Sequence, residues 1–331
     1  MTNVLADYRR SGLIPATVLL TLAFATGNRA FGQDWPTKPI RVIVPITAGS
    51  AADIVPRTVF EQVAAQLGQP IIVENRPGAG GTTGATAVAR SDPDGHTLLA
   101  MSSSYTIAPA VFANLAYDAA SDLKPVLPLG GLPNVLVVAG SAATQTVGAL
   151  VAAAKSKPGA LNYASVGMGT ATHLNAERFR LSAGISVQHV PFKGAPEALT
   201  EVMTGRIDFS FMPVVPAMSL IRDGKLSALA VGSTQRASSF PEVPTTIEAG
   251  FANSDFNFWL GVFAPSKTPD AIIDRLYTET RKALQLPSVR DRLAKLAVEP
   301  MLMNRNEFQA LVTHEIAANA ELAKAAGLSR Q

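Results

Sequence analysis

The sequence contains no cysteine, and this absence removes several kinds of chemistry at once. None of its 331 residues is a cysteine, so disulfide bonds, thiolate metal sites and cysteine nucleophiles are excluded. Anchoring through a lipidated cysteine at a processing site is excluded for the same reason. Any function must therefore rely on other side chains and on the backbone.

An excess of charge of one sign is also missing. The chain has 28 basic and 25 acidic side chains, and residues 1–32 hold three of the arginines and one of the aspartates. The remainder carries 25 basic and 24 acidic side chains, and no run of lysine and arginine alternates with aromatic residues. The sequence pI of 9.2 therefore does not indicate nucleic-acid binding, and we expect no nucleic-acid partner.

Long hydrophobic runs are confined to the N-terminal part. Arg9 and Arg10 precede the uncharged residues 11–27, and Ala30-Phe31-Gly32 places small residues where a signal peptidase requires them. We interpret residues 1–32 as a signal peptide cleaved after Gly32, which predicts a periplasmic protein. A single-pass anchor is the alternative, but the run of 17 residues is short for a span of about 20.

The motifs of common enzyme classes are absent or incomplete. Thr83 occupies the third glycine position of a dinucleotide fingerprint in residues 78–84, and no phosphate-binding loop of the G-x-x-x-x-G-K-[ST] type is present. Tyr163 stands where a nucleophile elbow around Ser165 needs glycine. The four histidines have no metal-ligand spacing. We therefore expect no catalytic activity, no cofactor and no metal ion.

Hydrophobic strands alternate with helices after residue 35. We predict strands at 40–44, 71–73 and 97–101, with helices at 53–67 and 82–90, a pattern typical of a largely parallel sheet. Pro56 is expected in the first turn of its helix, where a missing backbone donor is tolerated. A second series of the same kind begins near residue 135.

The positions of a proline- and glycine-rich segment and of a later return strand predict two lobes. Residues 124–140 are rich in proline and glycine and lead into a second α/β series, whereas residues 255–264 read as a return strand followed by three helices. We assign residues 33–134 and 256–331 to a first lobe and residues 135–255 to a second. Two crossings between the lobes imply a hinge.

Four predicted strands end in glycines and small hydroxyl residues that lead directly into a helix. The first turn of a helix has free backbone N–H groups and a partial positive charge, so such junctions bind anions, and in open α/β sheets they border the crevice. The candidate ligand-binding residues are Ala48, Gly49, Ser50, Asp53, Ser103, Ser104, Gly169, Thr170, His173, Lys193, Gly194 and Ala195.

Each junction also has a purely structural explanation. Glycine and serine after a strand are common in loops and helix caps. Asp53 is suited to balance the charge of a helix N-terminus, His173 to cap a helix, and Lys193 to face solvent. The occurrence of the pattern in both lobes favours a binding protein that closes on its ligand.

Several short motifs occur in a fixed order between Trp35 and Leu328. The most specific is Glu74-Asn75-Arg76-Pro77-Gly78-Ala79-Gly80-Gly81, which we interpret as a structural turn, and the others lie at 38–45, 67–70, 161–165 and 190–194. Together they resemble the Bug family of extracytoplasmic solute receptors, which serve tripartite tricarboxylate transporters.

This resemblance implies a two-lobed, type II-like periplasmic-binding-protein fold with crossing hinge strands. A small carboxylate would be the ligand, the integral-membrane permease subunits would be the partners, and the receptor would be a monomer. An exported hydrolase and a sensory receptor on the same scaffold are the alternatives.

Four departures from the family pattern bear on the ligand. Ser50 replaces a second glycine, Met168 a polar residue, Phe192 a tyrosine, and Met212-Pro213 an aspartate or asparagine. Because fewer polar side chains remain to pair with polar ligand groups, we expect a ligand with an apolar or aromatic body and one carboxylate.

Overall fold

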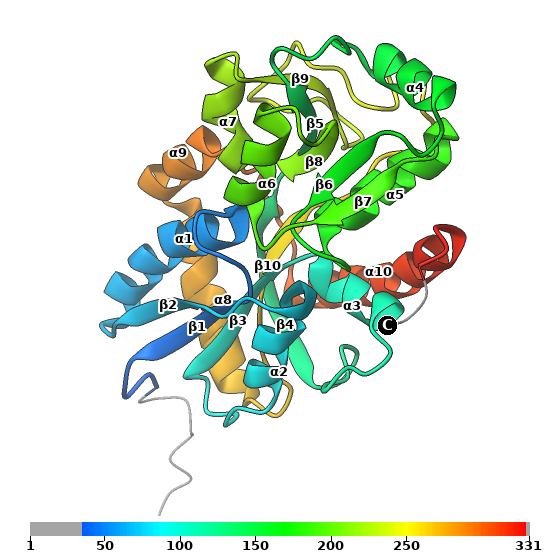
Figure 1. Cartoon of the computed structure of the whole chain (residues 1–331). Helices are drawn as coiled ribbons and strands as arrows, with labels where there is room; N and C mark the ends of the chain where they lie inside the picture. The colour runs from blue at the N-terminus through cyan, green and yellow to red at the C-terminus, as the bar shows by residue number, and fades with distance from the viewer. Residues whose placement is uncertain (1–34, 329–331) are drawn as a thin grey trace, which may run out of the picture.

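The structure of the chain is a computed structural model that describes residues 35–328. It contains two five-stranded sheets flanked by helices, so the predicted α/β class is confirmed (Figure 1). The predicted signal peptide lies outside the described residues. No helix within residues 35–328 has both the length and the hydrophobicity needed to cross a membrane.

The first sheet is mixed, and one of its five strands runs against the others. In spatial order it consists of β2 (Ile71–Asn75), β1 (Ile40–Val44), β3 (Thr97–Ser102), β10 (Trp259–Pro265) and β4 (Leu123–Gly131). β1 runs parallel to β2 and β3, but β10 runs antiparallel to β3 and β4. β2, β1, β3 and β4 therefore run in one direction, as the predicted largely parallel sheet requires, and β10 alone opposes them because it enters from the second lobe.

β4 occupies a segment that we expected to be an irregular crossing. It is a nine-residue strand at the sheet edge, and its Pro125 and Pro128 lie opposite Phe263 and Gly261 of β10. Proline cannot donate to a strand ladder, but an edge strand needs donors on one side only. The prolines therefore mark an edge and not a break.

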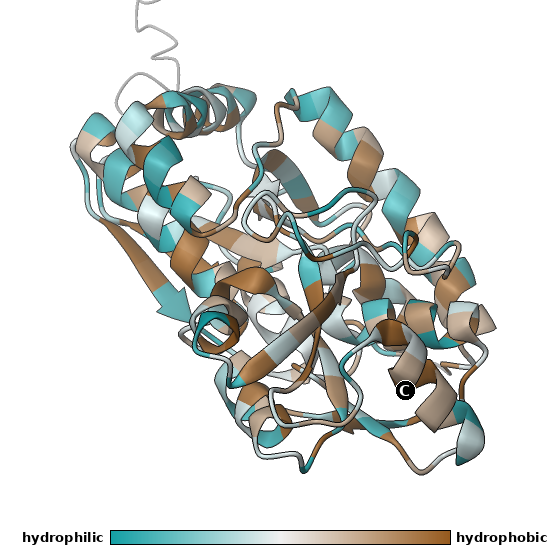
Figure 2. Cartoon of the chain, turned by 90° about the horizontal axis from the view of Figure 1, so that it is seen from above, coloured by the Kyte–Doolittle hydropathy of each residue, from teal (hydrophilic) through white to brown (hydrophobic). Residues whose placement is uncertain are grey.

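Helices α1 (Ala51–Leu67), α8 (Asp270–Gln285) and α9 (Pro287–Lys295) pack together beside this sheet, and α10 (Arg305–Ala325) packs on α3 (Ser104–Val111) and β4. A short 3-10 turn (Ala79–Gly81) leads into α2 (Thr82–Ala89). The three predicted C-terminal helices are present. The helices alternate along their length between hydrophobic and hydrophilic residues, as amphipathic helices on a core do (Figure 2).

The start of α1 differs from the prediction. Extended Ser50 precedes the helix, and its carbonyl accepts hydrogen bonds from Asp53 N and Ile54 N, so the helix begins at Ala51. Pro56 consequently lies inside the helix and not in its first turn. Our sequence analysis did not predict α3, which contains Pro109 in its second half.

The second sheet follows the order β7 (Gln188–Pro191), β6 (Asn162–Ser165), β8 (Phe209–Pro213), β5 (Asn134–Ala139) and β9 (Leu226–Val231). It is also mixed, since β5 runs antiparallel to β8 and β9. Its helices are α4 (Val147–Ser156), α5 (Ala171–Ala183), α6 (Ala195–Met203) and α7 (Val214–Arg222). Phe179, Phe209 and Phe211 are fully buried between the sheet and these helices.

Two adjacent connections join the sheets. Leu132-Pro133 links β4 to β5, and residues 232–258 link β9 to β10. Backbone hydrogen bonds hold the connections together: Leu132 N donates to Phe258 O at 2.8 Å and Gly232 N to Asn134 O at 2.7 Å. The predicted lobe boundaries, after residues 134 and 255, stay a prediction; they fall at the start of β5 and before β10.

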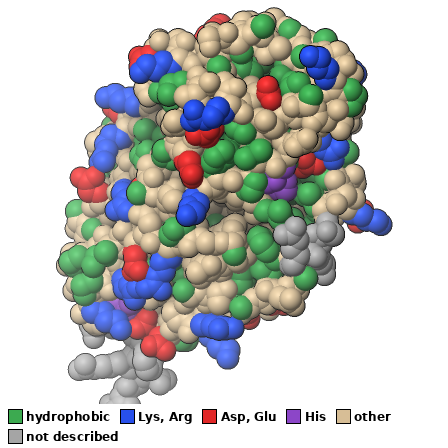
Figure 3. Space-filling view, in the orientation of Figure 1, with side chains coloured by type: hydrophobic (Ala, Val, Ile, Leu, Met, Phe, Trp, Pro, Cys, Tyr) green, Lys and Arg blue, Asp and Glu red, His purple; other side chains and the backbone are tan. Residues whose placement is uncertain are grey.

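The surface carries charges of both signs. On the face shown in Figure 3, basic and acidic side chains are interspersed, and no large area has one sign. This distribution agrees with the nearly equal numbers of basic and acidic residues in the sequence.

Candidate functional site: the cleft between the lobes

A cavity of about 580 Å³ lies between the two lobes. The first lobe contributes the loop after β1, the 77–81 loop, and the end of β3 with the start of α3. The second lobe contributes the loop after β6 and the loop after β7. The lining residues are Pro45, Ile46, Thr47, Ala52, Pro77, Gly78, Ala79, Gly80, Gly81, Met101, Ser102, Ser104, Phe112, Val166, Gly167, Met168, Thr170, Pro191, Phe192 and Lys193.

The structure brings the four predicted strand-to-helix junctions to this cavity. Of the candidate residues, Ser104, Thr170 and Lys193 line it directly. The others are chain neighbours of lining residues or lie further back. Ala48, Gly49 and Ser50 follow Thr47, Ser103 precedes Ser104, Gly169 precedes Thr170, Gly194 and Ala195 follow Lys193, and Asp53 and His173 lie in the first turns of α1 and α5.

The two lobes contact one another around the cavity. The Ser104 hydroxyl on the first lobe accepts a hydrogen bond of 2.9 Å from Ala171 N at the start of α5. Ser102 donates to the same hydroxyl at 2.9 Å. Ser104 therefore joins the end of β3 to the first turn of a helix in the other lobe.

Glycines make further contacts between the lobes possible. A Cβ atom at Gly194 would lie 2.0 Å from Thr47 Oγ1, and one at Gly80 would lie 2.5 Å from the Met168 carbonyl. A Cβ atom at Gly169 would lie 2.8 Å from the Phe112 ring. Each pair joins opposite lobes, so the lobes are closed on one another in this structure. The two lobes can approach this closely because glycine, which has no Cβ atom, occupies these three positions.

Three hydroxyl groups beside the cavity have no hydrogen-bond partner within residues 35–328. They are Thr47 Oγ1, Ser50 Oγ and Ser103 Oγ, and all three atoms are buried. Ser50 caps α1 without a side-chain hydrogen bond. Buried polar groups are normally paired, so unpaired hydroxyls near the N-termini of two helices are suited to form hydrogen bonds with a ligand oxygen.

The Asp53 carboxylate is already engaged by the protein. It accepts hydrogen bonds from Gly49 N at 3.1 Å, Arg57 Nε at 2.9 Å and Asn75 Nδ2 at 2.9 Å. Burial raises the pKa of Asp53, but the hydrogen bonds from Arg57, Asn75 and Gly49 outweigh it and hold the pKa below its ordinary value. The geometry favours the structural alternative, in which Asp53 fixes the Gly49 loop.

His173 and His189 brace the loop before α5 from behind. His173 Nδ1 accepts from Gly169 N at 3.3 Å, and His189 Nε2 lies 2.6 Å from Ser165 Oγ. The two rings stack with centroids 4.0 Å apart, and the Tyr163 ring stacks on His189. Burial lowers the pKa of His173 to about 4 and that of His189 to about 3. Both rings are therefore neutral at physiological pH, and His173 shapes the loop without lining the cavity.

The cavity has little charge of its own. Lys193 is the one charged side chain among its lining residues, and it is exposed. Backbone N–H groups at the starts of α1, α3, α5 and α6 supply the remaining positive potential. An anion held here would be bound mainly by helix termini and hydroxyls, with Lys193 at the edge.

The walls of the cavity are strongly apolar. Ile46, Met101, Phe112, Met168 and Phe192 all line it. Sequence reasoning anticipated Met168 and Phe192 but missed Met101 and Phe112, because they belong to a predicted strand and to a helix that was not predicted.

Two sequence interpretations change with the structure. The 74–81 motif was predicted to be a structural turn, and Glu74 does pair with Arg41 and Arg76. Its second half, however, lines the cavity. The three glycines of this motif, all with positive φ, were the feature of the sequence that could have predicted its place at the cavity. Conversely, Met212 is fully buried and does not line the cavity, so it gives no support to an apolar ligand.

Residues 55–328 match the family model described as the tripartite tricarboxylate transporter family receptor. The chain belongs to this family. Among its relatives is a UPF0065 protein of Bordetella pertussis, 32% identical over 317 residues that cover 96% of this chain and 97% of that protein. Protein BugT of the same organism is 34% identical over 286 residues, covering 85% of this chain and 87% of BugT.

Solved structures show the same receptor fold. The periplasmic binding protein BugD is 30% identical with a TM-score of 0.85, covering 90% of this chain and 100% of BugD. MatC from Rhodopseudomonas palustris with bound malate is 32% identical, TM-score 0.83, covering 87% and 99% of the two chains. R. palustris Rpa4515 with adipate is 29% identical, TM-score 0.86, covering 90% and 100%. The predicted Bug-family receptor with its two-lobed fold is thus confirmed.

Proposed function

We propose that this receptor binds a small carboxylate in the cleft between its lobes and delivers it to the permease of a tripartite tricarboxylate transporter. The observation that carries the proposal is the cavity itself, where helix N-termini from both lobes meet around unpaired hydroxyls. Two structurally similar receptors carry malate and adipate, which supports a carboxylate as the ligand class.

The walls of the cavity favour an apolar body on the ligand. Met101, Phe112 and Phe192 can cover an aliphatic or aromatic chain, whereas Lys193 is the one side chain able to neutralise a second carboxylate. Each extra charged group would have to be desolvated without a matching partner, which is costly. We therefore propose a ligand with one carboxylate at the helix termini and an apolar remainder.

The protein would act outside the cytoplasmic membrane, as a monomer and without catalysis. Its relatives and structural neighbours are binding proteins of the periplasm, which supports residues 1–32 as a signal for export. The contact between Ser165 and His189 resembles part of a hydrolase dyad. However, Ser165 is fully buried, bonds to Gly167 and does not line the cavity, so the geometry argues against the hydrolase alternative.

A thermal-shift screen of the full chain against carboxylic acids tests the proposed ligand class. A ligand at one hundred times its dissociation constant stabilises the folded state by about 2.7 kcal/mol, which is readily measured. We expect monocarboxylates with aliphatic or aromatic bodies to raise Tm more than malate, adipate or citrate. A larger response to citrate would refute the apolar ligand, and no response to any carboxylate would refute the ligand class.

Thr47 offers a sharper test within the cleft. Its hydroxyl is buried and unpaired, so Thr47→Val should leave the stability of the ligand-free protein unchanged. If the hydroxyl binds the carboxylate, affinity should fall about ten- to hundredfold, because a charge-assisted hydrogen bond is lost. Calorimetric titration measures this, with Thr278→Val on the exposed side of α8 as the matched control. Equal affinity in both variants would remove Thr47 from the site.

A further inference from the structure

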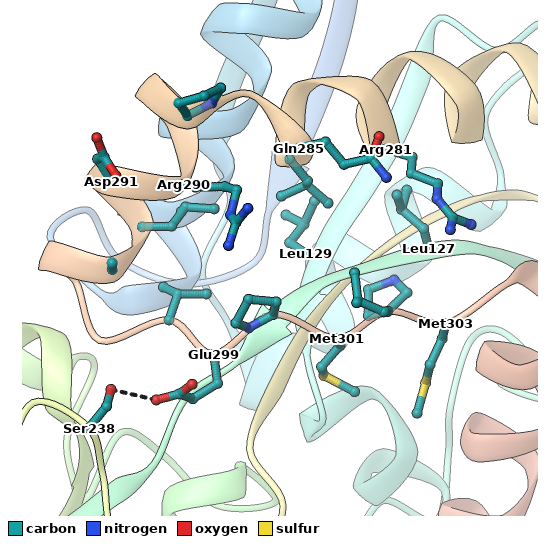
Figure 4. Close-up of a pocket in the computed structure, with 18 of the residues that line it drawn as sticks. Leu127, Leu129, Ser238, Arg281, Gln285, Arg290, Asp291, Glu299, Met301 and Met303 are labelled. Carbon is teal, nitrogen blue, oxygen red and sulfur yellow. Dashed lines mark hydrogen bonds between the residues drawn. The ribbon is translucent and has the colours of Figure 1, made fainter. Parts of the chain in front are cut away.

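A second cavity, of about 490 Å³, lies in the first lobe and shares no lining residue with the cleft. It is bounded by β4, α8, α9 and the segment 298–303 that leads toward α10 (Figure 4). Its volume is within the range of small-molecule sites in proteins. No step of the proposed function uses it.

The floor of this cavity is hydrophobic and well packed. Leu127, Leu129, Leu293 and Val298 line it, and each is more than 90% buried. Met301 and Met303 form the wall on the side of the 298–303 segment (Figure 4). Methionine side chains adapt easily to the shape of an apolar partner, so the floor and wall suit an aliphatic or aromatic group.

Two arginines on neighbouring helices extend over this floor. Arg281 projects from α8 and Arg290 from α9, both toward β4 and the 298–303 segment (Figure 4). Neither forms an ion pair with a carboxylate of residues 35–328. Arg281 contacts the Tyr277 hydroxyl and stacks over that ring at 5.7 Å, so its charge is positioned but not neutralised.

The two acidic residues at the edge do not neutralise the arginines. Asp291 points away from the cavity in Figure 4. Glu299 accepts a 2.6 Å hydrogen bond from Ser238 Oγ, which comes from the connection between β9 and β10. The guanidinium groups therefore face an apolar surface with their charges free for a ligand.

The edge of the cavity also exposes apolar surface. Leu302 is 81% exposed, the largest value among the exposed large hydrophobic side chains of residues 35–328. Exposed apolar surface next to a cavity commonly marks a contact site in a folded protein. Hydrophobic area and unneutralised positive charge thus occur at the same place.

We propose that this cavity is a second ligand site, for an amphipathic organic anion with one acid group and an apolar body. The two guanidinium groups lie at opposite ends of the cavity in Figure 4, and the acid group pairs with one of them, Arg281 or Arg290, because a guanidinium binds a carboxylate through two parallel hydrogen bonds. The apolar body lies on Leu129 and Leu293 and against Met301. The site is independent of the cleft and of the transport ligand.

Methionines allow the two sites to be observed separately in one experiment. Met301 and Met303 line the second cavity, whereas Met101 and Met168 line the cleft. In the full chain labelled with 13C at methionine methyl groups, each resonance is assigned through a Met→Leu variant. Octanoate is then titrated, with octylammonium as the probe of opposite charge.

We expect octanoate, but not octylammonium, to shift the Met301 and Met303 resonances in a saturable manner. The double variant R281A/R290A should weaken that binding at least about tenfold. Arg292→Ala is the control, because Arg292 lies on α9 with Arg290 but pairs with Glu61 outside the cavity. This variant should leave the affinity for octanoate unchanged.

The opposite results overturn the proposal. Unshifted Met301 and Met303 resonances, equal responses to both probes, or equal affinity in the double variant would each show that no anion site exists here. Failure of the cleft function would appear instead at Met101 and Met168, so the two proposals fail independently.

Discussion

Several ionisable side chains are buried close to the cleft, and their shifted pKa values make the stability of the protein depend on pH. The Glu315 carboxyl on α10 accepts hydrogen bonds from Trp259 Nε1 at 2.9 Å and Thr106 Oγ1 at 3.2 Å. Burial raises the pKa of Glu315 to about 7, and the two donors only partly offset it. Thr106 belongs to α3, whose first residue lines the cleft.

Glu315→Gln should therefore stabilise the protein at high pH. A folded-state pKa raised above the unfolded value gives stability that is complete below about pH 4.5 and is lost as the pH rises through about 7. The variant should match the wild type near pH 5 and be more stable by roughly 1–3 kcal/mol at pH 8.5. Urea unfolding at the two pH values measures this difference. The same gain in Glu321→Gln, an exposed change on α10, would contradict the explanation.

The stacked rings of His173 and His189 should lower the stability of the protein at acidic pH, whereas Glu315 lowers it at high pH. Burial lowers the pKa of His173 and His189 to about 4 and 3, while the unfolded chain takes up protons near pH 6.5. The unfolded state therefore binds more protons, and stability falls as the pH decreases from about 6.5 toward 4.

His189→Gln should reduce this acid sensitivity. The variant removes one of the two groups whose protonation the fold resists, so its unfolding free energy should change less between pH 7 and pH 5 than that of the wild type. Denaturant unfolding at both pH values measures the difference. His314→Gln, an exposed change on α10, serves as the control, and an unchanged slope in His189→Gln would disprove the assignment.

Among the elements, strands rich in β-branched and aliphatic residues could be predicted from sequence. β1 has the predicted bounds, because four of its five residues are aliphatic and Pro45 follows its last residue. β4 could not be recognised, since its prolines are compatible with a strand only at an edge, and edge position depends on long-range pairing. The antiparallel entry of β10 depends on the same long-range order.

The residues of the candidate site likewise divide into those that local sequence predicts and those that only the tertiary structure reveals. The junctions around Ser104 and Thr170 could be predicted because glycine and hydroxyl residues before a helix have a local physical meaning. The contribution of Met101 and Phe112 could not, because it depends on how the two lobes meet. The engagement of Asp53 by Asn75, 22 positions away in the chain, was equally invisible to local pattern.

Close approach of the loops predicts a specific effect of a small substitution. Gly194→Ala places a methyl group 2.0 Å from Thr47 Oγ1 of the other lobe. The backbone at Gly194 is extended, so alanine causes no local strain. The closed form should become less favourable, which weakens ligand binding at least about tenfold without lowering the Tm of the ligand-free protein.

Calorimetric titration and thermal unfolding measure the two quantities separately. Gly148→Ala in α4 is the control, because its added methyl group would meet no atom within 4 Å. Unchanged affinity in Gly194→Ala would show that the contact with Thr47 is not required for binding.

At the scale of the whole molecule, the proposed function requires two lobes that close on a carboxylate. The two adjacent connections are the proposed hinge, and contacts such as that from Ala171 N to Ser104 Oγ join the lobes. Hinge closure of this kind occurs widely among periplasmic binding proteins. In this proposal, ligand binding and lobe closure are one event.

The absence of native cysteine allows this claim to be tested directly. Ala113→Cys in the first lobe and Ala152→Cys in the second are exposed positions that can carry one spin label each, and pulsed electron resonance measures the distance between them. We predict a broad distance distribution without ligand that shifts and narrows when a binding carboxylate is added. A distribution that stays the same while calorimetry shows the carboxylate bound would show that binding does not close the lobes.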